Sequence, residues 1–159
     1  MTYSLRKATV KDAPSIAFMN VSLARESENK ELNLALVNKG VVALLEDANK
    51  GWYLLACEGD NLIGQLMITY EWSDWRNGWF WWIQSVYVLP GRRGMGIFKA
   101  LYNEVCSMAK SEENVVGVRL YVEEHNANAK KVYGLTLIIK ISLLVFLNKG
   151  KNLHDLIIK

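Results

Sequence analysis

The chain has 159 residues, of which 51% are hydrophobic, and no Pro-, Gly- or Ser-rich stretch divides it. A chain of this length can bury about 70% of the surface that its unfolded form exposes, so we predict a single domain over residues 1–159 that needs neither disulfides nor a metal. The net charge is +3 and the lysines and arginines are scattered, which argues against nucleic acid as a partner.

The two cysteines, Cys57 and Cys106, show neither Cys-x-x-Cys nor metal-ligand spacing. Because both lie in predicted secondary structure, we expect buried free thiols and therefore a reducing cytoplasm. The first residues read as a strand and not as a charged and then apolar leader, which also favours a cytoplasmic location.

The first quarter of the chain is predicted to form a strand and then two helices. Residues 3–8 form the strand, and Thr9-x-x-Asp12 with Pro14 behind it is a capping-box start for the first helix. One side of that helix carries four residues: Ile16, Asn20, Leu23 and Ala24. The second helix runs to about Asn49, where Asn-Lys-Gly ends it. Four positions are compatible with it: Leu32, Ala35, Leu36 and Val42.

Three strands follow the helices. Residues 52–58 and 62–71 are apolar runs separated by Gly59-Asp60-Asn61, which predicts a hairpin, and residues 79–89 form the third strand after a turn at 73–78. Alternation places five residues of the third strand on one face: Phe80, Trp82, Gln84, Val86 and Val88. Both faces of this strand are largely apolar, which predicts a central position in the sheet.

The third strand runs through a glycine-rich turn into a helix. The inward stripe of this helix consists of Ile97, Leu101, Val105 and Met108. Gly94 and Gly96 let a ligand approach the main chain, and free N–H groups at a helix start attract anions, so the turn is predicted to hold phosphate. The pair Arg92-Arg93 would add charge partners for phosphate, or is simply solvated. A strand over 115–122 and a helix over 126–133 complete a β-α-α-β-β-β-α-β-α order in three layers.

Two of these segments together resemble the acetyl-coenzyme A signature of the GNAT superfamily of N-acetyltransferases. They are Val88-x-Pro90 with Arg93-Gly94-Met95-Gly96-Ile97-Phe98, and Asn126-x-x-Ala129-x-x-x-Tyr133, and the resemblance covers residues 3–133. It implies acetyl-coenzyme A as co-substrate and no metal. It also implies a mixed α/β fold, in which helices cover both faces of a twisted, mostly antiparallel sheet with one splayed strand pair.

The resemblance assigns ten residues to the coenzyme: Val86, Tyr87, Val88, Arg93, Gly94, Met95, Gly96, Ile97, Phe98 and Asn126. Phe98 stands where the family usually has a small residue. Its side chain therefore either keeps the first helical turn further from the pyrophosphate or turns away into the core. Asn126 is also a good helix N-cap, and both roles are compatible.

By the same resemblance, the main chain of Val86 and Val88 holds the pantetheine amides in the splayed gap, and an amine attacks the thioester directly in a ternary complex. Tyr133 matches the family's general acid, and a phenol can protonate the leaving thiolate at neutral pH. A protonated amine must lose a proton, directly or through water, and Glu71 is the first candidate base and Asp74 the second. The other interpretation of these two carboxylates is a charged strand end beside a solvated turn.

The acceptor is predicted to be a primary amine of a small molecule or peptide. Glu26, Glu28 and Glu31 lie where the family places the acceptor pocket, although a solvated face explains them as well. Tryptophans cluster between residues 72 and 82, and they could line a site for a cationic amine or belong to the core. A second candidate function is a protein of the same fold that binds the coenzyme or a partner without catalysis.

Residues 135–159 depart from the family pattern, because they are rich in isoleucine, leucine and lysine and lack the expected turn. Residues 137–145 alternate as a last strand, and an exposed edge there could pair with a second subunit, so a homodimer is predicted. The alternative is a membrane span, but the apolar run is shorter than about 18 residues and contains Lys140, so no membrane is expected.

Overall fold

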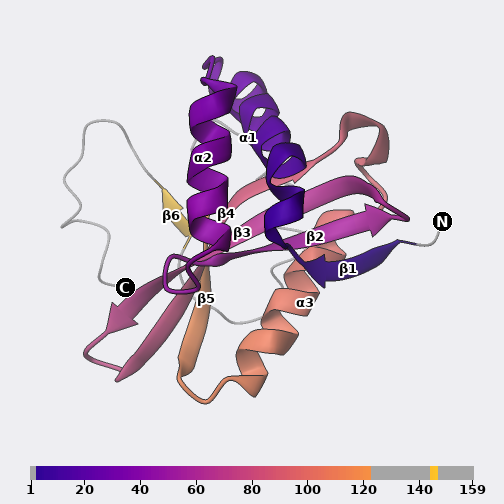
Figure 1. Cartoon of the computed structure of the whole chain (residues 1–159). Coiled ribbons are helices and arrows are strands. Elements are labelled where there is room, and N and C mark those ends of the chain that lie inside the picture. The colour runs from indigo at the N-terminus through magenta and orange to yellow at the C-terminus, as the bar shows by residue number, and fades with distance from the viewer. Residues whose placement is uncertain (1–2, 123–143, 147–159) are drawn as a thin grey trace.

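The computed structural model describes residues 3–122 and 144–146. A six-stranded sheet forms its centre, in the order β1-β2-β3-β4-β5-β6 (Figure 1). The strands are β1 (Ser4–Lys7), β2 (Trp52–Glu58), β3 (Asn61–Ser73), β4 (Gly78–Val88), β5 (Val115–Val122) and β6 (Leu144–Phe146). Strands β1 to β4 pair in antiparallel fashion, whereas β5 is parallel to both β4 and β6. The predicted mixed, mostly antiparallel sheet is confirmed.

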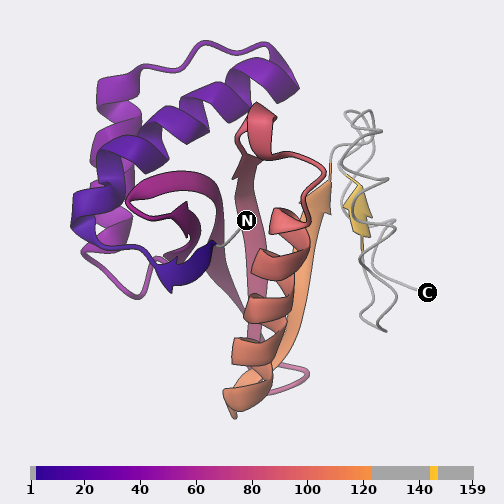
Figure 2. The same cartoon turned by 90° about the vertical axis from the view of Figure 1, so that its right-hand side faces the viewer.

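Helices cover both faces of this sheet. Figure 2 shows α1 (Ala13–Glu28) and α2 (Leu34–Leu45) together on one side, and α3 (Ile97–Ser111) on the other. Two short 3-10 turns, η1 (Val10–Asp12) and η2 (Pro90–Arg92), follow β1 and β4. The element order agrees with the predicted one as far as β5. The helix predicted over residues 126–133 lies outside the described residues.

The sheet separates two hydrophobic cores. Strand β2 contributes to both, because its side chains alternate between the two faces of the sheet. Leu54 and Ala56 belong to the core under α3, and Tyr53, Leu55 and Cys57 belong to the core under α1 and α2. The predicted stripe of α3 is confirmed at three buried positions and one half-buried position: Ile97, Leu101, Val105 and Met108. The thiol of Cys57 is buried as expected, whereas that of Cys106 is half-buried.

The second helix is shorter than predicted. It ends at Leu45, before the predicted Asn49. Leu32 precedes the helix and Leu36 is 70% exposed, whereas Val41 is the buried position. Val42, one of the four compatible positions, is half-buried and packs against the core under α1 and α2.

Strand β4 contains a β-bulge that the alternation pattern did not predict. Met67 of β3 pairs with Gln84, but Gln65 pairs with Tyr87, so β4 carries one extra residue in this stretch. Ser85 lies inside it with φ of 48°, a left-handed conformation that is uncommon for serine. Such an insertion bends a strand and reverses the alternation of the side chains that follow.

The bulge corrects the predicted faces of β4. The side chain of Tyr87 lies on the same face of the sheet as that of Gln84, the face that α1 covers. The reason is that their partners on β3 are two residues apart. Val86 and Val88 pack against the core under α3 instead. The prediction that five alternate residues share one face is therefore wrong beyond Gln84, because the extra residue breaks the period of two.

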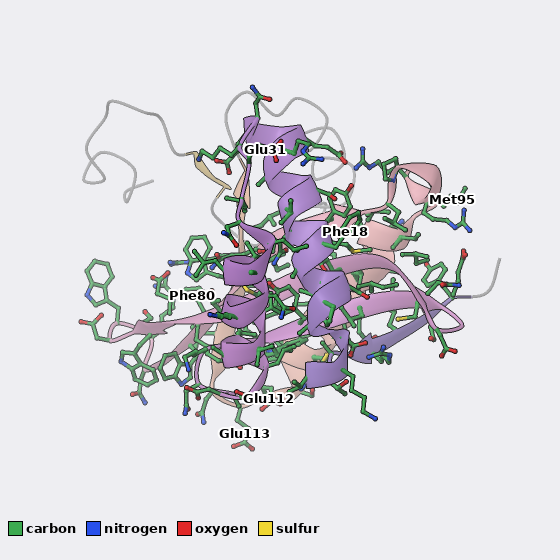
Figure 3. The ribbon with its side chains drawn as sticks, turned by 45° about the horizontal axis from the view of Figure 1, so that its top comes forward. Phe18, Glu31, Phe80, Met95, Glu112 and Glu113 are labelled. Atoms are coloured by element: carbon green, nitrogen blue, oxygen red, sulfur yellow. The ribbon has the colours of Figure 1, made fainter. Side chains whose placement is uncertain are left out.

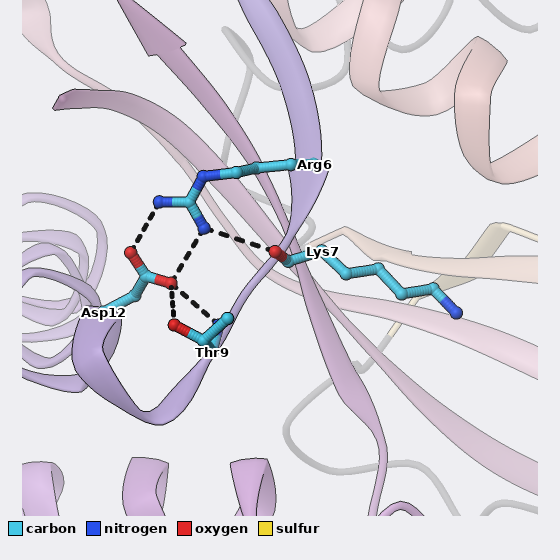
Figure 4. Close-up of polar contacts among 4 residues, drawn as sticks. All are labelled: Arg6, Lys7, Thr9 and Asp12. Atoms are coloured by element: carbon cyan, nitrogen blue, oxygen red, sulfur yellow. Dashed lines mark hydrogen bonds and ion pairs between the residues drawn. The ribbon is translucent and has the colours of Figure 1, made fainter. Parts of the chain in front are cut away.

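Asp12 ties β1 to the start of α1 (Figure 4). Its carboxylate accepts two hydrogen bonds from the Arg6 guanidinium, of 2.7 and 2.8 Å. One of its oxygens also accepts from the Thr9 N–H at 2.7 Å and from the Thr9 hydroxyl at 3.0 Å. The predicted capping box is present, but it caps the 3-10 turn η1, which runs directly into α1. The hydrogen bonds from Arg6 are the main cause that lowers the pKa of Asp12 to about 2.

We expect Asp12→Asn to cost about 1–2 kcal/mol of unfolding free energy at pH 7, because a paired cap is lost on a partly exposed surface. The folded-state pKa lies below the ordinary value, so the contribution of Asp12 is complete above that ordinary value and is lost as the pH falls through about 2. Urea unfolding of both proteins at pH 7 and near pH 2 measures this. The difference should shrink markedly at the lower pH, and an unchanged difference would contradict the assignment.

Candidate active site

The turn after β4 leaves its main chain open. Gly94 and Gly96 both have φ of 78°, which favours glycine, and a Cβ added at either would meet no atom within 4 Å. Gly96 is the N-cap of α3 and supplies no side-chain hydrogen bond to the helix. Met95 between them is 46% exposed and lies at the rim of the molecule (Figure 3). The first N–H groups of a 15-residue helix therefore border an uncovered turn.

Phe98 turns into the core, which settles the alternative left open by the sequence. It is only 8% exposed, and its ring centroid lies 6.1 Å from that of Tyr102 one turn later in α3. The bulky side chain thus points away from the glycine turn, although it stands where the family usually has a small residue. Ile97 is also buried. Neither side chain therefore covers the main-chain N–H groups at the start of α3.

The gap beside this turn begins where β4 and β5 stop pairing. Their parallel register ends at Ile83 and Leu120, while β4 continues to Val88. Beyond Ile83, one edge of β4 still pairs with β3, and the other has no strand partner among the described residues. The predicted splayed pair is therefore present, with Val86 and Val88 on its β4 side.

Both arginines of the turn are paired with carboxylates. Arg92 forms a two-pronged pair with Glu58, with its shortest contact at 2.7 Å. Arg93 donates from Nη2 to Glu26 at 2.6 Å and from Nε to the main-chain oxygen of Val88 at 2.9 Å. The two arginines that were expected to contact phosphate are therefore paired with carboxylates of the protein in this structure.

Glu26 joins α1 to β4. Its second carboxylate oxygen accepts a 2.5 Å hydrogen bond from the hydroxyl of Tyr87. This hydrogen bond, together with Arg93, lowers the pKa of Glu26. Burial and the same carboxylate raise the pKa of Tyr87. Glu26 belongs to the acidic cluster that the resemblance places near the acceptor pocket, whereas Tyr87 was assigned to the coenzyme and not to a contact with Glu26.

A buried polar chain backs the bulge. Gln65 is fully buried and donates to Asn20 at 2.7 Å and weakly to the main-chain oxygen of Ser85 at 3.5 Å. Asn20 in turn donates to the hydroxyl of Tyr53 at 3.0 Å. Burial raises the pKa of Tyr53. Gln65 was missed by the sequence reasoning, although an isolated amide inside the apolar run 62–71 is a signal for such a contact.

Glu71, the first candidate base, forms an ion pair. It accepts from Arg119 at 2.7 Å and also from the indole N–H of Trp82, and its side chain is 41% exposed. Glu71 pairs on the ladder with Phe80, four residues before Gln84, which is roughly 13 Å along the strand from the bulge. Glu71 therefore lies beside the paired part of β4 and β5, away from the gap.

The remaining predicted residues divide into two groups. Asp74, the second candidate base, is exposed at the β3–β4 turn and accepts from the N–H of Trp75, which is itself 85% exposed. Because this turn is the end of the hairpin far from the bulge, the aromatic wall expected there does not border the gap. Asn126 and Tyr133 lie outside the described residues.

The open turn, the uncapped helix and the splayed strands lie within the part of the chain that matches a known family. Residues 15–135 match the acetyltransferase (GNAT) family. The chain belongs to the GNAT family of acetyltransferases. It is 42% identical to a possible acetyltransferase from Clostridium difficile 630, with 96% of this chain and all of that chain covered and a TM-score of 0.82.

A more distant solved structure supports the fold alone. Ribosomal-protein-alanine N-acetyltransferase from Brucella melitensis biovar Abortus 2308 is 20% identical, with 91% of this chain and 98% of that chain covered and a TM-score of 0.68. No curated protein matches the chain. Within residues 3–122 and 144–146, no helix of this GNAT protein is long and apolar enough to cross a membrane.

Proposed function

We propose that this GNAT protein is an acetyl-coenzyme A-dependent N-acetyltransferase that acts on a primary amine of a small molecule or peptide by direct attack in a ternary complex. The observation that carries the proposal is the start of α3, where two left-handed glycines leave the helix N–H groups uncovered. Such a helix start binds the diphosphate of a coenzyme. Its position at the mouth of the splayed strands supports entry of the pantetheine arm between β4 and β5.

Each assigned residue would have its own role in binding or in catalysis. The main chain of Gly94, Gly96 and the first turn of α3 would hold the pyrophosphate, and the free edge of β4 would hold the pantetheine amides. Tyr133 would protonate the leaving thiolate, and Glu71 would accept the proton of the amine through water. We expect Tyr133→Phe and Glu71→Gln to lower kcat by about tenfold or more without changing the Kd of coenzyme A.

Calorimetry with acetyl-coenzyme A, followed by an amine panel with thiol release as readout, tests the proposal. We expect binding to one site and thiol release with at least one primary amine. Binding without turnover on any amine would favour the second candidate, a coenzyme-binding protein that has lost catalysis. Failure to bind acetyl-coenzyme A would overturn the proposal and leave only the alternative of a protein that binds a partner.

Three further expectations belong to this proposal. The free thiols support a cytoplasmic location. Among the described residues, no group of three or more His, Cys, Asp or Glu could hold a metal ion. The strand predicted near the C-terminus is seen in part, because Leu144 pairs with Leu120 of β5 in the same chain. A homodimer through that edge stays a prediction, to be measured by sedimentation.

A further inference from the structure

We propose that Glu26 and Arg93 form a latch over the Val88 carbonyl, which opens when coenzyme A enters and then presents Glu26 to a cationic acceptor. The inference rests on the proposed function. Glu26 lies on α1, outside the coenzyme motif. It would affect both the binding of coenzyme A and the binding of the acceptor.

The latch consists of three hydrogen bonds that join elements far apart in the sequence. Arg93 holds Glu26 through Nη2 at 2.6 Å and the Val88 oxygen through Nε at 2.9 Å. Tyr87 donates to the other oxygen of Glu26 at 2.5 Å, and the Arg93 guanidinium lies 5.4 Å from the centre of the Tyr87 ring. These contacts fix the guanidinium at the edge of β4.

The Val88 carbonyl is an acceptor on the free edge of β4. The N–H of Leu89 donates to the oxygen of Ile63 on β3 at 3.0 Å. Main-chain groups of successive strand residues point to opposite edges, so the oxygen of Val88 points away from β3, toward the side of the gap. Arg93 occupies this oxygen. A pantetheine amide that pairs with Val88 must therefore displace Arg93 from it.

The coenzyme itself supplies a competing partner for Arg93. Arg93 directly precedes Gly94, the first glycine of the turn, and charge-assisted pairs with phosphate are as strong as those with carboxylate. Once Arg93 moves to a phosphate, the described contacts of Glu26 reduce to the hydroxyl of Tyr87. The carboxylate, 41% exposed, then carries an unbalanced negative charge beside the gap. A protonated amine is the partner that such a charge attracts.

The latch predicts that removing Glu26 improves coenzyme binding. Because an exposed ion pair is weak, Glu26→Gln should lower the Kd of coenzyme A by about two- to fivefold, as measured by calorimetry. The same variant should raise the KM of a cationic amine several-fold. Glu26→Asp, which keeps the charge but shortens the reach to Arg93, should also tighten coenzyme binding, while it raises the KM of the amine less than Glu26→Gln does.

Glu58→Gln is the matched control. It removes the carboxylate that holds Arg92, changes the net charge by the same amount and leaves the Val88 oxygen covered by Arg93. It therefore reports how much a freed arginine and one lost negative charge improve binding by electrostatics alone. Glu26→Gln should tighten binding more than Glu58→Gln. Circular dichroism melts check that all variants are folded.

The outcomes separate this inference from the proposed function. If the wild-type protein does not bind coenzyme A, the proposed function fails. If it binds, but Glu26→Gln matches Glu58→Gln or binds more weakly, the latch is wrong and the pair is merely structural. If coenzyme binding tightens while the KM of the amine stays constant, Glu26 does not recognise the acceptor and that half of the inference is overturned.

Discussion

Gly96→Asp is expected to weaken the binding of coenzyme A at least tenfold more than Gly96→Asn does. Gly96 has φ of 78° and caps α3. Aspartate and asparagine have nearly the same shape and both tolerate this left-handed conformation better than other side chains, so their backbone strain is matched. Only aspartate places a negative charge in the turn. Two like charges 4 Å apart near a protein surface repel by up to about 4 kcal/mol before salt screening, which reduces the effect.

The same pair of variants should behave in the opposite order when the ligand is absent. An acidic N-cap interacts favourably with the helix dipole, by about 0.3–1 kcal/mol. Urea unfolding should therefore show Gly96→Asp to be at least as stable as Gly96→Asn, while calorimetry shows it to bind less coenzyme A. A loss of affinity that is equal in both variants would mean that no phosphate lies at this turn.

Gly51→Ala is expected to destabilise the fold by about 3 kcal/mol or more, a large part of the typical 5–15 kcal/mol. Gly51 has φ of 140° directly before β2, and an added Cβ would lie 2.1 Å from the main-chain oxygen of Ile68. Ile68 pairs with Trp52 in the β2–β3 ladder. The overlap is with backbone, so it can be relieved only by moving one strand of this central pair.

Gly59→Ala is the control for this variant. Gly59 also has a positive φ, of 58°, but an added Cβ there meets no atom within 4 Å. Its cost should be the conformational one alone, about 1–2 kcal/mol. Urea unfolding of the two variants thus separates the clash from the loss of glycine freedom. A difference below about 1 kcal/mol would show that the β2–β3 ladder yields more easily than the geometry indicates.

The predicted residues of the candidate site differ in how far their surroundings could be foreseen. Gly94 and Gly96 could be recognised because their neighbours along the chain define the strand, the turn and the helix. Glu71 was identified as a free carboxylate at a strand end, but Arg119, 48 residues away, holds it. Likewise, Arg93 was expected at phosphate and is held by Glu26, 67 residues earlier. No local pattern contains such pairs, because they depend on how the strands and α1 are brought together.

Four features could be predicted from the sequence alone: the order of the elements as far as β5, the stripe of α3, the start of α1 and the glycine turn. Each of these follows from interactions within a few residues, namely helix or strand periodicity, capping and glycine conformation. Three others could be seen only in the folded chain: the bulge at Ser85, the point where β4 and β5 part, and the partners of Glu26 and Glu71. These depend on register and on contacts between distant segments, which one extra residue in β4 is enough to change.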